Sequence, residues 1–399
     1  MTKRANTNDC PTDEADSVPA APFFLAPPRA AYIHIPFCAH KCGYCDFASV
    51  AGEDEQIDRF LSALDLEMAT QLSPGTEVET IFVGGGTPTY VSAAQLDRYL
   101  GRLNHWFRLT HDIEFTVESN PNTLTAEKVA ILADHGVNRV SLGAQSFRPH
   151  LLHQLERNHD PDSVSRAVEL LRKRIDNISI DLIFGIPGQT EREWEEDLEK
   201  GLSLDPNHLS AYGLTYEKGT ALWKQRRLGI VEQIDENIEA TMYEHLMDRM
   251  NQGNWRQYEI SNFARDERSC RHNLFYWANA PYYGFGTGAA AFRNNRRTLN
   301  LRPLVTYMER VEAGESPICQ SEVLDLESRA RETAILNLRR GQGISRANFV
   351  ETTGLEIDDL AGEAIRQFVD HGLLIDDGEA ICLTRAGFLL ADGILARIV

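Results

Sequence analysis

Short apolar runs alternate with helical patterns through the first half of the chain. Ile57, Phe60, Leu61, Leu64 and Met68 repeat at helical spacing, and Ser92-x-x-Gln95 and Thr190-x-x-Glu193 predict capping boxes that open two more helices. Runs rich in β-branched and aromatic residues, which predict strands, lie at 31–37, 80–84, 113–118, 139–144, 178–184 and 209–214. Strands joined by helical crossovers predict an α/β fold, with a curved or closed parallel sheet and helices outside it.

Three cysteines follow the first predicted strand at once. Cys38, Cys42 and Cys45 have the spacing Cys-x3-Cys-x2-Cys. Three thiolates on one short loop can hold three irons of a cubic [4Fe–4S] cluster, which leaves the fourth iron for a non-protein ligand. The alternative is a structural zinc site with His34 or His40 as the fourth ligand. The remaining cysteines are scattered singly at Cys10, Cys270, Cys319 and Cys382.

The cysteine segment has a recognisable context. His34-Ile-Pro-Phe-Cys-x3-Cys-x-Tyr-Cys-Asp-Phe47, followed by Gly84-Gly-Gly-Thr-Pro-Thr-Tyr90, resembles the radical S-adenosylmethionine (SAM) proteins. The resemblance is to the branch that contains oxygen-independent coproporphyrinogen III dehydrogenases and HemW-type heme chaperones, and it runs from about Tyr32 to the C-terminus. It implies a partial (β/α)6 barrel, a [4Fe–4S] cluster, and SAM that the cluster cleaves reductively.

Two departures distinguish the members of this branch. The dehydrogenases carry a further cysteine two positions after the third cluster cysteine, where this chain has Phe47. They also have an ordered N-terminal arm, whereas residues 1–28 are rich in Ala, Pro, Thr and Asp and predict a flexible tail. Both departures favour the HemW type.

The candidate SAM residues fall where strands end, which is where barrels of this type build their sites. Glycines let main-chain groups approach a ligand closely, which suits Gly84-Gly-Gly as a loop that contacts SAM. The resemblance implies that SAM is contacted by Tyr32, Tyr44, Gly85, Gly86, Thr87 and Glu118. A second SAM or substrate site is implied at Gln145, Arg157, Asp181 and Thr215. The alternatives there are an Arg157–Asp181 salt bridge and a hydrogen-bonded core amide for Gln145.

A second motif lies downstream of the barrel. Arg271-His272-Asn273-Leu-Phe-Tyr276-Trp277 resembles the His-Asn-x-x-Tyr-Trp signature of HemW-type proteins. Histidine is a common axial ligand of heme iron, and aromatic neighbours suit a porphyrin face. The alternative is that His272 bonds local groups beside a buried aromatic cluster.

Composition restricts the partners. The net charge of −19 opposes binding to nucleic acid. No apolar run approaches the roughly 20 residues that span a bilayer, and the acidic N-terminal segment resembles no signal peptide. Few cysteines outside one motif suit a reducing compartment, so we expect a cytoplasmic protein that is not transmembrane.

The last residues read as a separate module. Helical patterns at 326–338, 346–352 and 357–371 precede a hairpin at 373–383 that turns at Asp377-Gly378, which resembles a winged helix. Acidic residues outnumber basic ones in it, which favours contact with a protein, or covering of the barrel mouth, over binding to DNA. We therefore expect a tail at 1–28, a radical SAM barrel at 29–220, an extension packed on it at 221–320 and a winged-helix-like domain at 321–399.

Three functions remain open. The first is a heme chaperone that binds heme, receives electrons from a reductant and passes heme to acceptor hemoproteins. The second is an oxygen-independent coproporphyrinogen III oxidase, which the Phe47 position disfavours. The third is a metal-stabilised interaction protein without redox chemistry.

Overall fold

The computed structural model describes residues 22–265 and 267–398. Most of the predicted tail, residues 1–21, lies outside these ranges. The rest of it contains a short helix, α1 (Pro22–Leu25), that places Phe24 in a buried aromatic cluster. The Phe24 and Phe292 rings are 6.0 Å apart, so this end of the predicted tail packs on the body of the protein.

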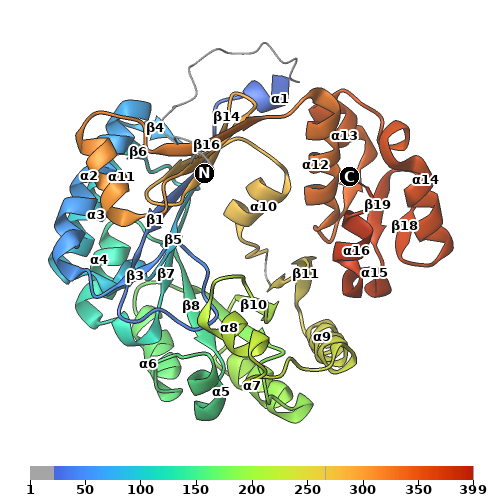
Figure 1. Cartoon of the computed structure of the whole chain (residues 1–399), viewed down its shortest axis with the longest axis horizontal. Coiled ribbons are helices and arrows are strands. Elements are labelled where there is room, and N and C mark those ends of the chain that lie inside the picture. The colour runs from blue at the N-terminus through green and yellow to red at the C-terminus, as the bar shows by residue number, and fades with distance from the viewer. Residues whose placement is uncertain (1–21, 266, 399) are drawn as a thin grey trace, which may run out of the picture.

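Six parallel strands form the centre of the molecule, as predicted. They lie side by side in chain order: β1 (Ala30–Ile35), β5 (Thr80–Gly85), β7 (Glu114–Ser119), β8 (Arg139–Gln145), β9 (Asn177–Phe184) and β10 (His208–Gly213). The connecting helices cover the outer, convex face of this curved sheet (Figure 1): α2 (Ile57–Gln71), α3 (Ala93–Trp106), α4 (Ala126–Asp134), α5 (Pro149–Gln154), α6 (Asp162–Leu171) and α7 (Glu191–Ser203). The predicted partial (β/α)6 barrel is confirmed.

The sheet continues past both ends of the barrel, which the sequence analysis did not predict. On one side β13 (Tyr282–Phe285) pairs parallel with β1 and leads to β14 (Ala290–Arg293), β15 (Arg296–Asn300) and β16 (Ile318–Val323). On the other side β10 is followed by β12 (Asn262–Ala264) and β11 (Arg256–Glu259). All twelve strands form one open sheet with β11 and β16 at its edges.

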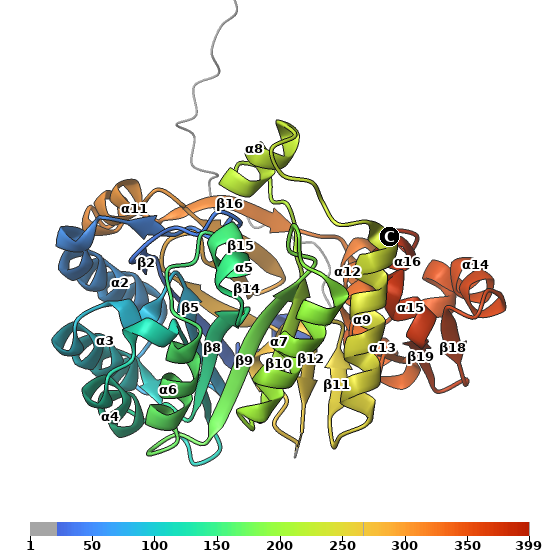
Figure 2. The same ribbon diagram turned by 90° about the horizontal axis from the view of Figure 1, so that it is seen from below.

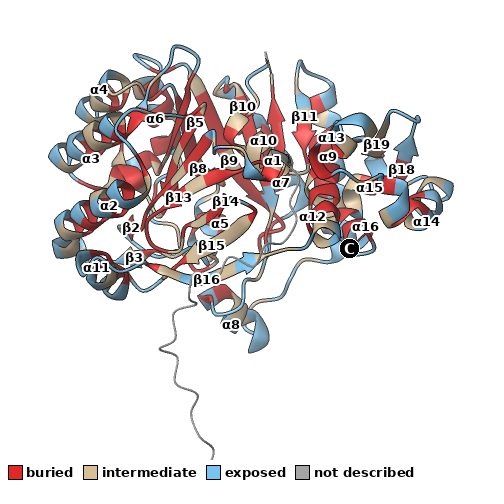
Figure 3. Cartoon of the chain, turned by 90° about the horizontal axis from the view of Figure 1, so that it is seen from above, coloured by how far each residue is buried: buried red, intermediate tan, exposed pale blue. Residues whose placement is uncertain are grey.

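The core lies between the sheet and the helices around it, where Figure 3 shows the buried residues. α2 buries Phe60, Leu64 and Met68, the stripe that predicted it. Both predicted capping boxes are confirmed. The Ser92 and Thr190 hydroxyls accept from the backbone N–H three residues on, and their own backbone N–H groups donate to the Gln95 and Glu193 side chains. Local capping and apolar periodicity therefore fix the helices that support the strand ends.

Four helices of the extension pack in different places. α9 (Glu236–Asn251) and α11 (Leu304–Glu312) contact the barrel helices α7 and α2. α10 (Arg271–Trp277) lies on the concave side of the sheet, against β5 (Figure 1). α8 (Ala221–Arg227) projects at the edge where the parallel strands end (Figure 2).

The C-terminal module has its own hydrophobic core and the predicted winged-helix arrangement. It contains α12 (Leu326–Leu338), β17 (Ile344–Ser345), α13 (Arg346–Thr353), α14 (Ile357–Asp370), β18 (Leu374–Asp376), β19 (Ala380–Leu383), α15 (Arg385–Leu389) and α16 (Ala391–Leu395). The wing pairs β18 with β19, and β17 joins them as a third strand. Among the described residues, no helix has the length and apolarity needed to cross a bilayer.

Candidate functional site

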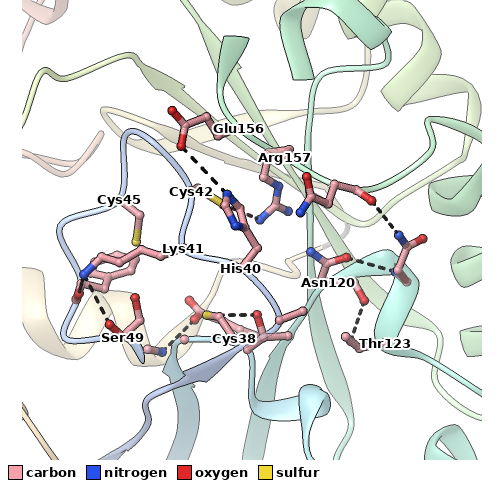
Figure 4. A pocket seen from close by; sticks show the side chains of 18 of the residues that line it. Cys38, His40, Lys41, Cys42, Cys45, Ser49, Asn120, Thr123, Glu156 and Arg157 are labelled. Carbon is pink, nitrogen blue, oxygen red and sulfur yellow. Dashed lines mark hydrogen bonds and ion pairs between the residues drawn. The ribbon is translucent and has the colours of Figure 1, made fainter. Parts of the chain in front are cut away.

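The three cysteines lie on one loop that is fastened at both ends. β2 (Phe37–Cys38) pairs with β3 (Val50–Ala51), and the Val50 N–H donates to the Pro36 carbonyl at 2.8 Å. In the middle of the loop, the Gly43 N–H donates to the Leu155 carbonyl at 3.2 Å. These contacts hold all three sulfurs around a single cavity of about 210 Å³ (Figure 4).

The donor set fits a group larger than one ion. Among the residues that the structure describes, no three His, Cys, Asp or Glu side chains converge closely enough to hold a single metal ion. Burial raises the pKa of Cys38 to about 11 and also raises the pKa of Cys45, so these thiols stay protonated until a metal displaces the protons. Three thiols spread around one cavity suit three corners of a cubic cluster.

The zinc alternative loses one of its two proposed histidine ligands. The Tyr32 hydroxyl bonds His34 Nδ1 at 3.0 Å, and His34 Nε2 bonds the Ala48 carbonyl at 3.0 Å, so both ring nitrogens of His34 are occupied. His40 is half exposed and lies 4.0 Å from Glu156. His34 is therefore not free to act as a fourth ligand, whereas His40 lines the cavity together with the three cysteines.

Two side chains from other loops contact the cysteine sulfurs. The Thr87 hydroxyl lies 3.6 Å from Cys38 Sγ. Arg157 donates from Nη1 to Cys42 Sγ at 3.6 Å and from Nη2 to the Gly143 carbonyl at 2.6 Å. The partly buried Arg157 guanidinium therefore bridges the cysteine loop to β8.

The glycine loop packs against the cysteine loop more closely than any side chain would allow. Gly85 has a φ of 108°, and a Cβ there would lie 2.5 Å from the His34 ring. A Cβ on Gly86 would lie 2.7 Å from the backbone of Pro36. The glycines are thus required both for backbone conformation and for close approach of the two loops.

Glu118 holds this glycine loop through a backbone hydrogen bond. Its carboxylate accepts from the Gly85 N–H at 3.1 Å. Burial, aided by the charge of Asp181, raises the pKa of Glu118 to about 7. The carboxyl therefore exchanges a proton near neutrality at the floor of the cavity.

The structure brings most of the predicted SAM residues together. The cavity is lined by the three cysteines and by Tyr44, Gly85, Gly86, Thr87, Glu118 and Arg157. Tyr32 lies behind this wall, bonded to His34. Gln145, Asp181 and Thr215 do not line the cavity.

Three residues of the predicted second site gather around Gly143. A Cβ there would lie 3.0 Å from Gln145 Nε2 and 3.1 Å from Arg157 Nη2, and Gly143 lies opposite Asp181 across the β8–β9 pairing. Gln145 has a φ of 64° at a register shift between β8 and β9. Asp181 accepts from the Ser141 and Ser179 hydroxyls at 2.9 Å and 3.1 Å. In the described part of the chain Arg157 donates to the Gly143 carbonyl and to Cys42 Sγ and forms no ion pair with Asp181, so the second ligand site stays a prediction.

One wall of the cavity was missed by the sequence analysis. It is formed by amide and hydroxyl side chains after β7 and α5: Asn120, Asn122, Thr123 and Asn158. Asn122 donates to the Asn158 carbonyl at 3.3 Å, which joins the two loops. The run Ser-Asn-Pro-Asn-Thr directly after a predicted strand was the available signal, because parallel strands bring such loops to one rim.

His272 lies away from this cavity, inside the concave side of the sheet. It is 1 % exposed, its Nδ1 bonds the Thr80 hydroxyl at 2.9 Å, and its ring packs on Phe82 and Tyr276. Burial lowers the pKa of His272 to about 3, which keeps the imidazole neutral. Nε2 has no hydrogen-bond partner in the described structure, so a buried lone pair or proton is left unsatisfied.

Comparisons with known proteins agree with this geometry. Residues 32–201 match the family model of the Radical SAM superfamily, and residues 324–390 match that of the HemN C-terminal domain. The solved structure of coproporphyrinogen III oxidase (HemN) from Escherichia coli superposes with a TM-score of 0.82 over 93 % of this chain and 90 % of that chain, at 22 % identity. This likeness establishes a shared fold.

Full-length relatives are closer in sequence. The heme chaperone HemW of Bacillus subtilis (strain 168) is 37 % identical over 93 % of this chain and 99 % of its own length. The heme chaperone HemW of Escherichia coli (strain K12) is 32 % identical over 92 % of this chain and 97 % of its own length. The chain therefore belongs to the HemW family of radical SAM proteins.

Proposed function

We propose that this protein is a heme chaperone of the radical SAM type, which binds heme and hands it to acceptor hemoproteins. The names of its full-length relatives support this function. The observation in the chain that carries the proposal is Phe47, which stands at the position of the extra cysteine of the dehydrogenases and is 62 % exposed at the cavity. An apolar side chain there offers contact surface in place of a thiol.

The proposed resident cofactors are a [4Fe–4S] cluster held by Cys38, Cys42 and Cys45, and SAM. When bound, such a cluster supplies an electron for the reductive cleavage of SAM. The protein's part is positioning: Arg157 orients Cys42, and Glu118 holds the Gly85 N–H. The SAM contacts proposed are Tyr44, Gly85, Gly86, Thr87 and Glu118, with Tyr32 supporting them through His34.

The proposed heme ligand is His272, through Nε2. Because His272 is 1 % exposed, heme iron reaches Nε2 only when α10 moves away from β5. His40, half exposed on the cysteine loop, is the accessible alternative. Substitution of each histidine in turn shows which of the two binds the heme iron. Thr80→Val is the control, because it removes the hydrogen bond to His272 and keeps the imidazole.

The competing function is oxidation of coproporphyrinogen III. The likeness to the E. coli oxidase concerns the fold, and the missing cysteine at position 47 argues against that chemistry. We expect no multiple-turnover decarboxylation of coproporphyrinogen III under anoxic, reducing conditions, measured by product chromatography. Repeated turnover would replace the chaperone proposal with the oxidase.

Transfer of heme tests the proposed function. The protein, reconstituted anaerobically and loaded with one equivalent of heme, is mixed with apomyoglobin, and the Soret band of the acceptor is followed. Direct hand-over predicts a rate that rises with acceptor concentration, because it proceeds through a complex of the two proteins. A rate independent of acceptor concentration means simple dissociation and contradicts the proposal. Since an exposed cluster site suits a reducing compartment, we place this transfer in the cytoplasm.

A further inference from the structure

One projecting segment carries a charge opposite to that of the whole protein. Residues 216–231, which we call the α8 arm, contain Lys218, Lys224, Arg226 and Arg227, all exposed, and a single acidic residue, Glu217. The complete chain has a net charge of −19. The arm is thus a local positive field on an acidic molecule, and Figure 2 shows it standing clear of the barrel.

The tip of the arm is also apolar. Leu228 and Ile230 are 72 % and 70 % exposed, which makes them the most exposed large apolar side chains in the described part of the chain. Exposed apolar side chains with charged residues around them are the composition of a protein-binding surface, in which the apolar centre supplies affinity and the charged rim selects the partner.

Two of the four cations of the arm are held in place by aromatic rings. The Arg226 guanidinium lies 4.8 Å from the centre of the Tyr216 ring, and the Arg227 guanidinium lies 5.1 Å from the centre of the Trp223 ring. Stacking on an aromatic face limits the side-chain entropy that a partner must remove on binding. The positive surface is therefore largely preformed.

The arm is fastened to the cysteine loop itself. The Leu222 N–H donates to the carbonyl of Gly43, which lies between Cys42 and Cys45, at 2.8 Å. The Leu222 side chain packs in a small core with Leu151 and Leu155, and Tyr44 of the cysteine loop packs against that core. A protein that docks on the arm is thus held beside the loop that carries the proposed cluster ligands.

We propose that the α8 arm docks an acidic one-electron carrier protein that reduces the cluster. This inference rests on the proposed function, because it assumes a cluster at the three cysteines. In the step, one electron leaves the reduced carrier and enters the cluster, and no bond is formed or broken. Opposite charges on the two surfaces speed the encounter, and Leu228 and Ile230 supply the contact.

Binding is tested with an acidic flavodoxin as the probe. We expect the full chain to bind it at low ionic strength, and the triple variant Lys224→Glu, Arg226→Glu, Arg227→Glu to bind at least tenfold more weakly in calorimetry. The matched control Lys173→Glu, Arg256→Glu, Arg366→Glu changes the net charge equally at exposed positions elsewhere and keeps the affinity. Leu228→Ser, Ile230→Ser weakens binding with little change in its salt dependence.

Electron transfer gives a second readout. Reduced flavodoxin should bleach the cluster at least tenfold more slowly in the arm variant than in the wild type or the control, whereas dithionite reduces all three at one rate. Equal rates and affinities for arm variant and wild type overturn the proposal. So does binding of the arm to phosphatidylserine vesicles without binding to flavodoxin. If heme transfer fails, the expected flavodoxin binding and cluster reduction are unchanged. The chaperone function and the docking on the α8 arm can therefore be refuted independently.

Discussion

At the scale of residues, each cysteine sulfur has its own setting. Cys38 lies beside Thr87, Cys42 accepts from Arg157, and the Cys45 N–H donates to the Cys42 carbonyl at 3.2 Å. Because each sulfur borders the cavity from a different direction, none can replace another as a ligand.

Replacing any one of them should therefore abolish the cluster. We expect Cys38→Ala, Cys42→Ala and Cys45→Ala to retain well under half of the wild-type iron and sulfide after anaerobic reconstitution, because one iron loses its thiolate. Cys319→Ala and Cys382→Ala serve as controls and should keep full occupancy, since neither cysteine lines the cavity. Iron and sulfide analysis with absorption spectra measures this, and a fully loaded Cys42→Ala protein would refute the ligand assignment.

Much of this site could be predicted because its residues follow strand ends in the sequence. Cys38 follows β1, Gly85 ends β5 and Glu118 lies near the end of β7, and parallel strands bring such positions to one rim. The contact of Arg157 with Cys42 depends on packing between distant loops, which no local pattern encodes. The same holds for the amide wall around Asn120 and Asn158.

At the scale of elements, one buried carboxylate joins the extension to the barrel. Glu67 of α2 accepts from the Gly286 N–H at 2.8 Å, from Asn300 Nδ2 at 2.6 Å and from the Tyr307 hydroxyl at 2.6 Å. These partners lie after β13, at the end of β15 and on α11. Burial raises the pKa of Glu67 to about 7 from the ordinary 4.5.

That shift predicts a pH dependence of stability. The folded protein keeps a proton on Glu67 that the unfolded chain releases near pH 4.5, so this contribution is complete below that pH and is lost as the pH rises through 7. Between pH 5 and 8, the wild-type free energy of unfolding should fall relative to that of Glu67→Gln by roughly 3 kcal/mol. Urea unfolding at several pH values measures it. Glu309→Gln, exposed on α11, is the control, and identical pH profiles for wild type and Glu67→Gln would exclude this role.

The barrel strands and capped helices were predictable because their patterns are local. The strands beyond β10 were not, because β11 to β16 are short and pair with partners brought close only by the fold: β13 lies against β1, some 250 residues away in the chain. Residue types in these strands are constrained by close contacts in the fold. At Gly284, for example, a Cβ would lie 1.8 Å from the Ala290 carbonyl oxygen.

At the scale of the whole molecule, an ionic network joins the barrel extension to the C-terminal domain. Glu332 of α12 pairs with Arg297 of β15 and with Arg329, whose side chain is almost fully buried. Asn279, just after α10, donates to Glu332 at 3.0 Å. The helix that carries His272 is thus linked to the C-terminal domain. Sequence patterns predicted that domain but not its attachment, because the network draws on three distant segments.

Neutralising the centre of this network should destabilise the protein. In Glu332→Gln, two arginines lose their shared counter-charge in a largely buried site, and we expect the free energy of unfolding to fall by about 2 kcal/mol. Glu327→Gln removes an exposed pair with Arg331 on the same helix and should cost less than about 1 kcal/mol. Chemical denaturation measures the free energy of unfolding of both variants. Equal losses in the two would mean that the network stabilises the protein no more than an ordinary surface ion pair does.

Heme binding by the intact chain is the most direct test of the account. Heme is titrated anaerobically into the cluster-loaded protein, and the Soret band is recorded for wild type, His272→Ala, His40→Ala and Thr80→Val. We predict saturation at one equivalent with the spectrum of histidine-ligated heme, lost in His272→Ala and kept in the other two variants. Absorbance that rises without saturation and is insensitive to every histidine would contradict the central claim that this protein is built to carry heme.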